Sequence, residues 1–439
     1  MALALACSWP VYAQEARDGL NVTGEVRLRY EAIDGQARAG FNKSDDLLNA
    51  RTAVLAEYRA GRLRAGMELY DSRVWGEGIG TPVSTNEVNA LEPVQAYVGA
   101  DVPNAFGDGS SLAVKIGRMT LNLGSRRLVS ADGYRNTTNG YTGIRGDFAG
   151  RGHWNATLLF VLPQTRLPND TEGVRDARVQ LDRESFDLVF WGGQVSKSRA
   201  VRDATLELTY FHLGERDSPS LQTRDRTLET LGGRVIVDPR ISGFDFELEA
   251  LYQSGHISSS TAPSASRLSV GAGFVHADAG YSFSRSWRPR LSLEFDLATG
   301  NQSGGHYGRF DTLFGSRRGD LAPGGLYNAV GRTNVIAPGV RLQATPSGRL
   351  TWFIAYRALW LAANEDSFST SGVRDPSGQS GNFAGHQLDG RVRYWIVPAR
   401  LQFEFDGLLL SKGRFLRDAP NAPPGRVTSY GSANLTFSF

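Results

Sequence analysis

The chain runs Leu401-Gln-Phe403-Glu-Phe405-Asp-Gly407-Leu-Leu409 near its C-terminus, and apolar and polar side chains alternate along this stretch with a period of two. Successive side chains of an extended strand point to opposite faces, so the leucines and phenylalanines share one face and Gln402, Glu404 and Asp406 share the other. The same alternation recurs over residues 22–31, 243–252 and 290–297. No apolar stripe of period 3.6 reaches helical length, so the sequence predicts an all-β fold.

The lengths of these segments separate a membrane barrel from a soluble sandwich. They run to roughly 10–14 residues, whereas strands of globular sheets have about 5–6 and a tilted bilayer-spanning strand needs about 9–11. Short links at 60–62, 150–152, 196–199, 238–240, 345–348 and 397–399 alternate with long links at 34–46, 76–89, 163–182, 300–328, 363–382 and 413–426. Short turns on one side and long loops on the other are typical of an outer-membrane barrel, and a sandwich gives no reason for such sorting.

Eighteen segments fit this description, an even number as in bacterial single-chain barrels. The expected strands cover residues 20–33, 47–60, 62–75, 90–101, 111–123, 140–149, 152–163, 183–195, 201–215, 227–239, 243–256, 267–283, 288–300, 330–345, 349–363, 383–397, 399–412 and 427–439. The sequence thus predicts a transmembrane antiparallel β-barrel of about 18 strands, with short periplasmic turns, long extracellular loops and both termini in the periplasm.

The first 13 residues are an uncharged, mostly apolar run that ends in Val11-Tyr12-Ala13, the small-x-Ala pattern of a signal-peptide cleavage site. We therefore expect residues 1–13 to be a signal peptide, cleaved before Gln14, and residues 14–439 to form a single barrel domain. The run lacks a positively charged leader, which favours a truncated start. Cleavage would remove Cys7, the only cysteine, and a cysteine-free chain suits an oxidising envelope compartment.

Composition and motifs argue against nucleic-acid binding and against catalysis. The formal net charge is +3, which is too balanced for a nucleic-acid binder of this length. The six histidines, at 153, 212, 256, 276, 306 and 386, show no metal-binding pair at helical spacing, and no Gly-x-Ser-x-Gly elbow occurs. One cysteine leaves no thiolate metal site. We expect no enzyme activity, no catalytic residues, no metal and no cofactor.

Charged side chains on the polar faces of the strands would line the lumen. About 18 strands are expected to enclose a water-filled channel and not a packed core. Of the 48 cations 44 are arginine, whose planar guanidinium suits carboxylates. The inward arginines would be Arg27, Arg29, Arg51, Arg145, Arg234, Arg341, Arg357, Arg391 and Arg393, with the acids Glu25, Glu68, Asp147, Glu249, Glu294, Asp296, Asp389 and Glu404 among them. Such a lining attracts anions; the alternative is that most of these arginines pair across neighbouring strands and only brace the wall.

One expected strand breaks its alternation. Over residues 111–123 the apolar face of Leu112, Val114 and Ile116 would carry Arg118 into lipid, where an arginine near the midplane costs about 2–4 kcal/mol. A bulge at Gly117 would turn Arg118 inward. We therefore expect Arg118 to be a lumen residue.

A resemblance to the alginate-export family of outer-membrane porins starts at Ile116-Gly-Arg118-Met-Thr-Leu-Asn-Leu-Gly124-Ser-Arg126-Arg127-Leu-Val, which is similar to the family's GRQ…GxxRLV segment. Further similar pieces follow the same order at residues 71–76, 143–148, 307–314, 388–395 and 413–415. The resemblance implies an 18-stranded barrel whose arginine-lined lumen passes the anionic polysaccharide alginate. By matching position it implies constriction residues at Arg73, Arg118, Arg145 and Arg391, with Asp147 beside them.

The strand pattern and the resemblance together give a candidate anion-binding set. Its members are Arg51, Arg73, Arg118, Arg145, Arg341, Arg391, Arg393 and Asp147. This sequence departs from the family at Met119, where Gln is usual, and its 397–399 link is too short to plug the periplasmic mouth as in alginate exporters. Two functions therefore stay open: passive export of an alginate-like polyuronate, and uptake of small organic acids or oligosaccharides.

The expected partners follow from these two functions. The solute would be an anionic carbohydrate or an organic acid, outer-membrane lipid and lipopolysaccharide would surround the barrel, and periplasmic secretion components would join it in the export case. No nucleic-acid partner is expected. The long link at 300–328 is rich in glycine and charge, so we expect it to fold inward and to pair with lumen charges.

Overall fold

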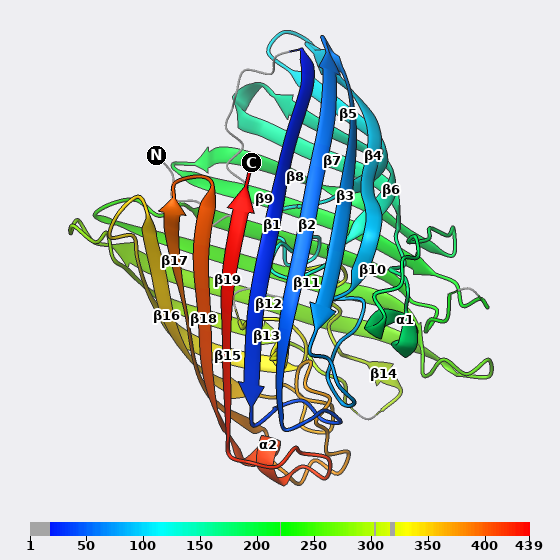
Figure 1. Cartoon of the computed structure of the whole chain (residues 1–439), viewed down its shortest axis with the longest axis vertical. Coiled ribbons are helices and arrows are strands. Elements are labelled where there is room, and N and C mark those ends of the chain that lie inside the picture. Colours follow the sequence, from blue (N-terminus) through cyan, green and yellow to red (C-terminus); the bar gives the residue numbers. More distant parts are fainter. Residues whose placement is uncertain (1–17, 220, 303, 317–320) are drawn as a thin grey trace.

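The computed structural model describes residues 18–219, 221–302, 304–316 and 321–439, and it forms an antiparallel barrel that closes where β1 pairs with β19 (Figure 1). The expected signal peptide lies outside the described residues. The wall strands are β1 (Gly19–Asp34), β2 (Ser44–Ala60), β3 (Leu63–Trp75), β4 (Asn89–Pro103), β5 (Ser111–Thr120), β6 (Gly140–Gly150), β7 (Trp154–Pro163), β8 (Leu188–Val201), β9 (Ala204–Glu215), β10 (Thr227–Val237), β11 (Gly243–Ser258), β12 (Arg267–Ser282), β13 (Arg290–Ala298), β15 (Val335–Ala344), β16 (Leu350–Trp360), β17 (Phe383–Val397), β18 (Leu401–Lys412) and β19 (Val427–Ser438).

These eighteen wall strands confirm the predicted fold and its strand order. The largest differences are at β8, which covers Leu188–Val201 and not residues 183–195, and at β15, which begins at Val335 and not at 330; β5 ends at Thr120 and not at 123. β1 begins and β19 ends at the same end of the barrel, opposite the long loops (Figure 1).

Four short elements that the alternation did not predict lie in the links. They are β14 (His306–Tyr307), which pairs in parallel with β12, the helices α1 (Thr171–Arg175) and α2 (Arg414–Asp418), and the 3₁₀ turn η1 (Arg151–His153). No helix among the described residues is long and apolar enough to span a bilayer.

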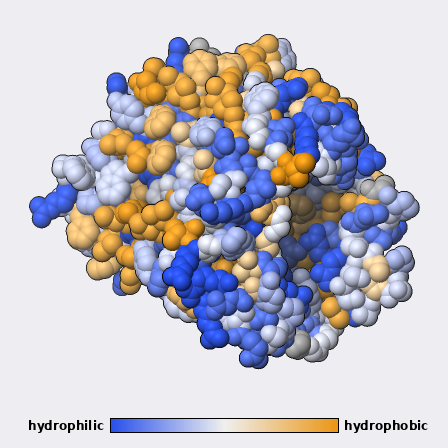
Figure 2. Space-filling view, turned by 60° about the horizontal axis from the view of Figure 1, so that its bottom comes forward, coloured by the Kyte–Doolittle hydropathy of each residue, from blue (hydrophilic) through white to orange (hydrophobic). Residues whose placement is uncertain are grey.

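The alternation read from the sequence sorts side chains between lipid and lumen. On β18, Phe403, Phe405 and Leu409 are exposed on the outer face, while Glu404 and Asp406 are buried on the inner face. Figure 2, in which the α2 end comes forward, shows hydrophobic side chains on the wall and hydrophilic ones gathered at the loop end, beside a hollow in the surface. The outer face is therefore an apolar surface suited to acyl chains.

At the loop end of the barrel, loops fold inward and pack against the wall. Inward residues of the strands, such as Tyr141, Phe190 and Phe211, join one buried hydrophobic cluster with loop residues such as Val129 and Tyr327. The expectation that the barrel has no packed core is therefore wrong for this part of the lumen. The strand count sets the width of the barrel, but long loops that fold inward narrow the lumen.

Candidate functional site: the constricted lumen

The link between β5 and β6, residues 121–139, crosses the lumen, and we call it the constriction loop. One end of it is fixed to β1 and β2 by arginines whose donors bind its backbone. Arg27 Nη1 donates to the carbonyl oxygen of Gly133 at 2.8 Å, and Arg51 Nη1 donates to the same oxygen at 3.1 Å. Arg27 Nη2 also donates to the carbonyl of Arg135 at 2.8 Å. Two cations of the wall therefore act as anchors for this loop.

The other end of the constriction loop is fixed to β11. Arg127 Nη1 lies 2.6 Å from Glu249 Oε2 and also pairs with Glu247, and Ser125 Oγ donates to Glu249 Oε1 at 2.9 Å. Around the barrel, nine strands separate β1 from β11 in one direction and seven in the other. The loop therefore spans the lumen from one wall to the opposite wall.

The link between β13 and β15, residues 299–334, folds against the constriction loop as expected from its charges. Phe314 N donates to Leu128 O at 2.9 Å, and Ser130 N donates to Phe314 O at 3.0 Å, so the two loops share backbone hydrogen bonds. Asp311 pairs with Arg226, and Leu326 N donates to Glu31 Oε2 at 3.0 Å. Residues 317–320 of this link lie outside the described part of the chain.

Inward side chains of β13 to β18 form two neighbouring groups of ion pairs on one wall. Glu294 lies 3.7 Å from Arg341 and also pairs with Arg357, which in turn lies 2.8 Å from Asp389. Next to this group, Glu404 lies 3.8 Å from Arg391 and also pairs with Arg393. The acids hold the guanidinium groups in place along the wall.

An aromatic ring lies among these arginines. The guanidinium carbon of Arg341 lies 3.8 Å from the centre of the Phe353 ring, and that of Arg391 lies 5.3 Å from it. Arginine over an aromatic face gains cation–π attraction. The arrangement presents two planar cations and an apolar ring side by side on β15, β16 and β17.

The structure places six of the eight predicted site residues on the inner face. Arg341, Arg391 and Arg393 lie together on the wall just described, and Arg51 is buried at the anchor of the constriction loop. Arg145 and Asp147 lie on β6, where Arg145 Nε is 2.8 Å from Asp147 Oδ2. These six residues are therefore divided among three places and do not form one cluster.

The bulge predicted at Gly117 is wrong. Pairing runs without a register shift through Gly117 on both sides of β5, although its φ is +122°. Arg118 stays on the side of the exposed Ile116, opposite the buried Met119. Arg118 avoids contact with lipid because Nη1 lies 2.6 Å from the buried Glu92 and Nε lies 2.8 Å from Glu184, a residue of the β7–β8 link.

Arg73 occupies one of the alternate positions of β3 whose side chains face outward. It alternates with the buried Ser72 and Val74, and its Nε lies 3.0 Å from Asp71. The geometry therefore separates Arg73 and Arg118 from the lumen arginines.

The β7–β8 link brings a buried acid to the loop end of β4. Asp182 accepts hydrogen bonds from Leu167 N at 2.9 Å and Asn89 Nδ2 at 3.0 Å, and its carbonyl oxygen accepts one from Arg118 Nη2 at 3.0 Å. Burial, with a contribution from the charge of Glu92, raises the pKa of the Asp182 carboxyl to about 7. The pKa of Glu87, in the β3–β4 link, is likewise raised to about 7 by burial and by Glu31.

Sequence reasoning missed three lumen residues that the structure brings into the site. Arg127 depends on a contact between distant segments, so no local signal pointed to it. Phe353 and Lys115 are different, because their inward positions follow from the alternation that places Ile354 and Ile116 outside. Among the described residues, no group of three His, Cys, Asp or Glu side chains is placed to hold a metal ion.

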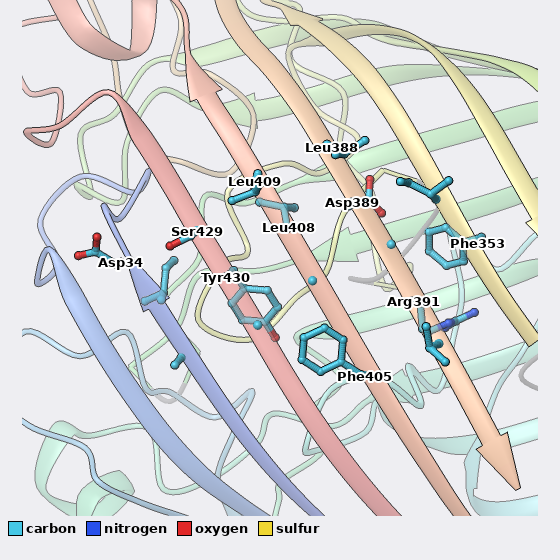
Figure 3. A pocket seen from close by; sticks show the side chains of 17 residues that line it. Asp34, Phe353, Leu388, Asp389, Arg391, Phe405, Leu408, Leu409, Ser429 and Tyr430 are labelled. Carbon is cyan, nitrogen blue, oxygen red and sulfur yellow. The ribbon is translucent and has the colours of Figure 1, made fainter.

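A hollow of about 670 Å³ lies on the outer face of the barrel and is distinct from the lumen (Figure 3). Gly390, Gly407 and Gly431 lie in register across β17, β18 and β19, and the exposed Phe405 and Leu409 stand beside them. Because this face is apolar, the hollow belongs to the lipid-facing surface.

Comparison with known protein families gives a match over most of the chain. The family model for alginate export matches residues 18–429. The chain belongs to the alginate-export family. No curated protein sequence matches this family member. The match covers every strand from β1 to β18, so the assignment applies to the barrel as a whole.

Solved structures with the same fold are very different in sequence from this alginate-export family member. It is similar to Acinetobacter baumannii OccAB1 (12% identity, TM-score 0.61, covering 97% of this chain and 98% of that chain). It is also similar to the outer membrane protein opdK from Pseudomonas aeruginosa (11% identity, TM-score 0.57, 95% and 99%) and to Pseudomonas aeruginosa OccK5 (OpdH) (10% identity, TM-score 0.56, 96% and 98%). Family and fold together make the protein an outer-membrane channel of a Gram-negative bacterium.

Proposed function

We propose that the channel passes small anionic solutes, organic acids or short uronate oligosaccharides, by passive diffusion. The observation that carries this proposal is the constriction loop, which runs from Arg27 and Arg51 on one wall to Glu247 and Glu249 on the opposite wall. A lumen crossed by a fixed loop suits a small solute better than a polymer.

The preference for anions is supported by the arginines beside Phe353. The ion pairs of Arg341 and Arg391 are 3.7 and 3.8 Å long, against 2.8 Å for the pair of Arg357 with Asp389. A solute carboxylate competes more readily for a guanidinium whose own acid is farther away, because a planar guanidinium binds carboxylates through two parallel hydrogen bonds. The acids nearby keep that binding weak, which conduction requires.

Selectivity measurements in planar bilayers test the preference for anions. The reversal potential in asymmetric KCl is measured for the wild type and for Arg341→Gln, Arg391→Gln and Arg393→Gln, singly and combined. We expect an anion preference that falls stepwise and is lost in the triple variant. Arg73→Gln is the matched control, because it removes one arginine from the outer face of the wall. A wild type without anion preference, or a triple variant that keeps it, contradicts the proposal.

Export of a polyuronate is the second candidate, and the family match favours it. Proteoliposome swelling separates the two, because it measures how fast a solute enters through the channel. A small-solute channel admits glucuronate and excludes long uronate oligomers, whereas a polymer exporter admits both. Equal entry of both would favour export.

A further inference from the structure

Four cations lie in one cross-strand row on the inner face of β2 to β6. Arg59 is paired in register with Arg64, Arg64 with Gly99, Gly99 with Lys115, and Lys115 with Arg145. Neighbouring strands lie about 4.7–4.9 Å apart. The row holds no acid, and Gly99 leaves room for the side chain of Arg64, whose Nε would lie 3.0 Å from a methyl group at that position.

The row rises from the periplasmic mouth into the lumen. Arg59 is one residue from the periplasmic end of β2, whereas Arg145 is five residues from the periplasmic end of β6. This follows from the tilt of barrel strands, since a line drawn across them cannot stay level. An anion that enters from the periplasm therefore meets Arg59 first and Arg145 last along this row.

Lys115 is the cation of the row with no acid of its own. Arg59 lies 2.8 Å from Asp101, Arg64 also pairs with Asp101, and Arg145 pairs with Asp147. Among the described residues, no carboxylate lies within ion-pair distance of the Lys115 ammonium. The half-buried lysine is instead held over the ring of Tyr97, with Nζ 3.7 Å from the ring centre.

The ring beneath Lys115 is itself fixed in place. A methyl group at Gly66 would lie 2.6 Å from the Tyr97 side chain, so only glycine at this position of β3 lets the ring lie against the wall. The Tyr97 hydroxyl donates to Glu57. Glycine, ring and carboxylate therefore hold the ammonium in one place without neutralising it by a direct ion pair.

We propose that Lys115, with Arg64 and Arg145 on either side, forms an anion subsite in the periplasmic part of the lumen, and that it takes a carboxylate of the solute. This inference rests on the proposed function and adds a second anion-binding site to the one formed by the arginines beside Phe353. A compact ammonium flanked by two guanidinium groups provides charge and donors for a mono- or dicarboxylate. Weak binding of the solute carboxylate at this subsite favours its release and passage along the channel.

Block of the KCl current by succinate, added on the periplasmic side, tests the subsite. The block is compared among wild type, Lys115→Met and Lys115→Arg, all in the same bilayers used to measure ion selectivity. We expect Lys115→Met to raise the half-blocking succinate concentration about tenfold, as for one lost charge-assisted hydrogen bond. Lys115→Arg, which keeps the cation, restores most of the block. A shift of the heat-dependent gel band on boiling confirms that each variant has folded.

Lys197→Met is the matched control for this experiment. Lys197 also lies on a strand and over an aromatic ring, 5.0 Å from the centre of Trp154, but on the outer face of β8. An unchanged block in Lys115→Met, or an equal change in Lys197→Met, overturns the subsite. If the wild type shows no anion preference, the proposed function itself is wrong. If the wild type prefers anions and succinate blocks the Lys115→Met channel as strongly as the wild-type channel, only the subsite is wrong.

Discussion

Arg127 Nη1 of the constriction loop lies 2.6 Å from Glu249 Oε2 of β11, and the two residues are 122 positions apart in the chain. Both side chains are nearly buried. This ion pair closes the span of the loop across the lumen, because the opposite end is held by Arg27 and Arg51. One arginine that faces two glutamates therefore holds this end of the loop to the wall.

Arg127→Ala is expected to raise the single-channel conductance. The change removes the ion pairs that hold the loop to β11, so the loop moves out of the lumen and the open cross-section grows. Planar-bilayer recordings in symmetric KCl measure the effect. Arg240→Ala removes an exposed ion pair with Asp203 at a periplasmic turn and serves as the control. Equal conductance of Arg127→Ala and wild type would show that the loop keeps its position without this pair.

Phe190→Ala is expected to lower the free energy of unfolding by about 3–5 kcal/mol. Phe190 is fully buried, stacks on Phe211 with ring centres 5.0 Å apart, and meets Phe314 of the β13–β15 link edge to face at 5.3 Å. The loss of the ring leaves a cavity where wall and loop meet. Urea unfolding in detergent micelles measures the effect.

Phe186→Ala is the control for that measurement, because Phe186 lies only four residues away but is 78% exposed. It should leave the stability unchanged. Similar stabilities of Phe190→Ala and wild type would mean that the loops contribute nothing to the stability of the barrel.

The fold could be predicted from sequence because alternation is a local property. The residues from Leu401 to Leu409 determine which side chains of β18 meet lipid, whatever the rest of the chain does, and the same holds for each wall strand. The sorting of short and long links predicted that the strands form a membrane barrel and which end of it faces the periplasm. Together, alternation and loop length predicted all eighteen wall strands.

The candidate site could be predicted only where it depends on that alternation. Arg341, Arg391 and Arg393 followed from strand parity, and so did the inward position of Arg145. The path of the constriction loop did not, because it depends on hydrogen bonds between residues more than a hundred positions apart, such as Arg27 and Gly133. The free-energy cost of exposing Arg118 to lipid suggested a bulge at Gly117. Instead, Arg118 pairs with Glu184, an acid far away in the sequence, and this pair removes the cost.

Arg118→Gln is expected to leave ion selectivity unchanged and to lower the free energy of unfolding by about 3 kcal/mol, as when one partner of a buried ion pair is removed. The reason is its position: Arg118 lies on the outer parity of β5 and neutralises Glu92, whose side chain is fully buried. Reversal potentials and urea unfolding measure the two effects. A fall in anion preference without a fall in stability would instead make Arg118 a pore residue.

Stability at the loop end is expected to fall as pH rises from about 5 to 8. The carboxyl groups of Asp182 and Glu87 have pKa values raised to about 7, chiefly by burial, whereas unfolded carboxyls titrate near 4. Between these values the folded state binds more protons than the unfolded state, so the stabilisation is complete at low pH and is lost as pH passes through 7. We expect a loss of about 1–3 kcal/mol per group. Thermal unfolding of wild type and of the Asp182→Asn/Glu87→Gln double variant between pH 5 and 8 measures it.

The double variant should lose the pH dependence, while Asp176→Asn, an exposed change in the same link as Asp182, should keep it. A wild type that grows more stable toward pH 8 would mean that both carboxylates are charged and paired in the folded barrel.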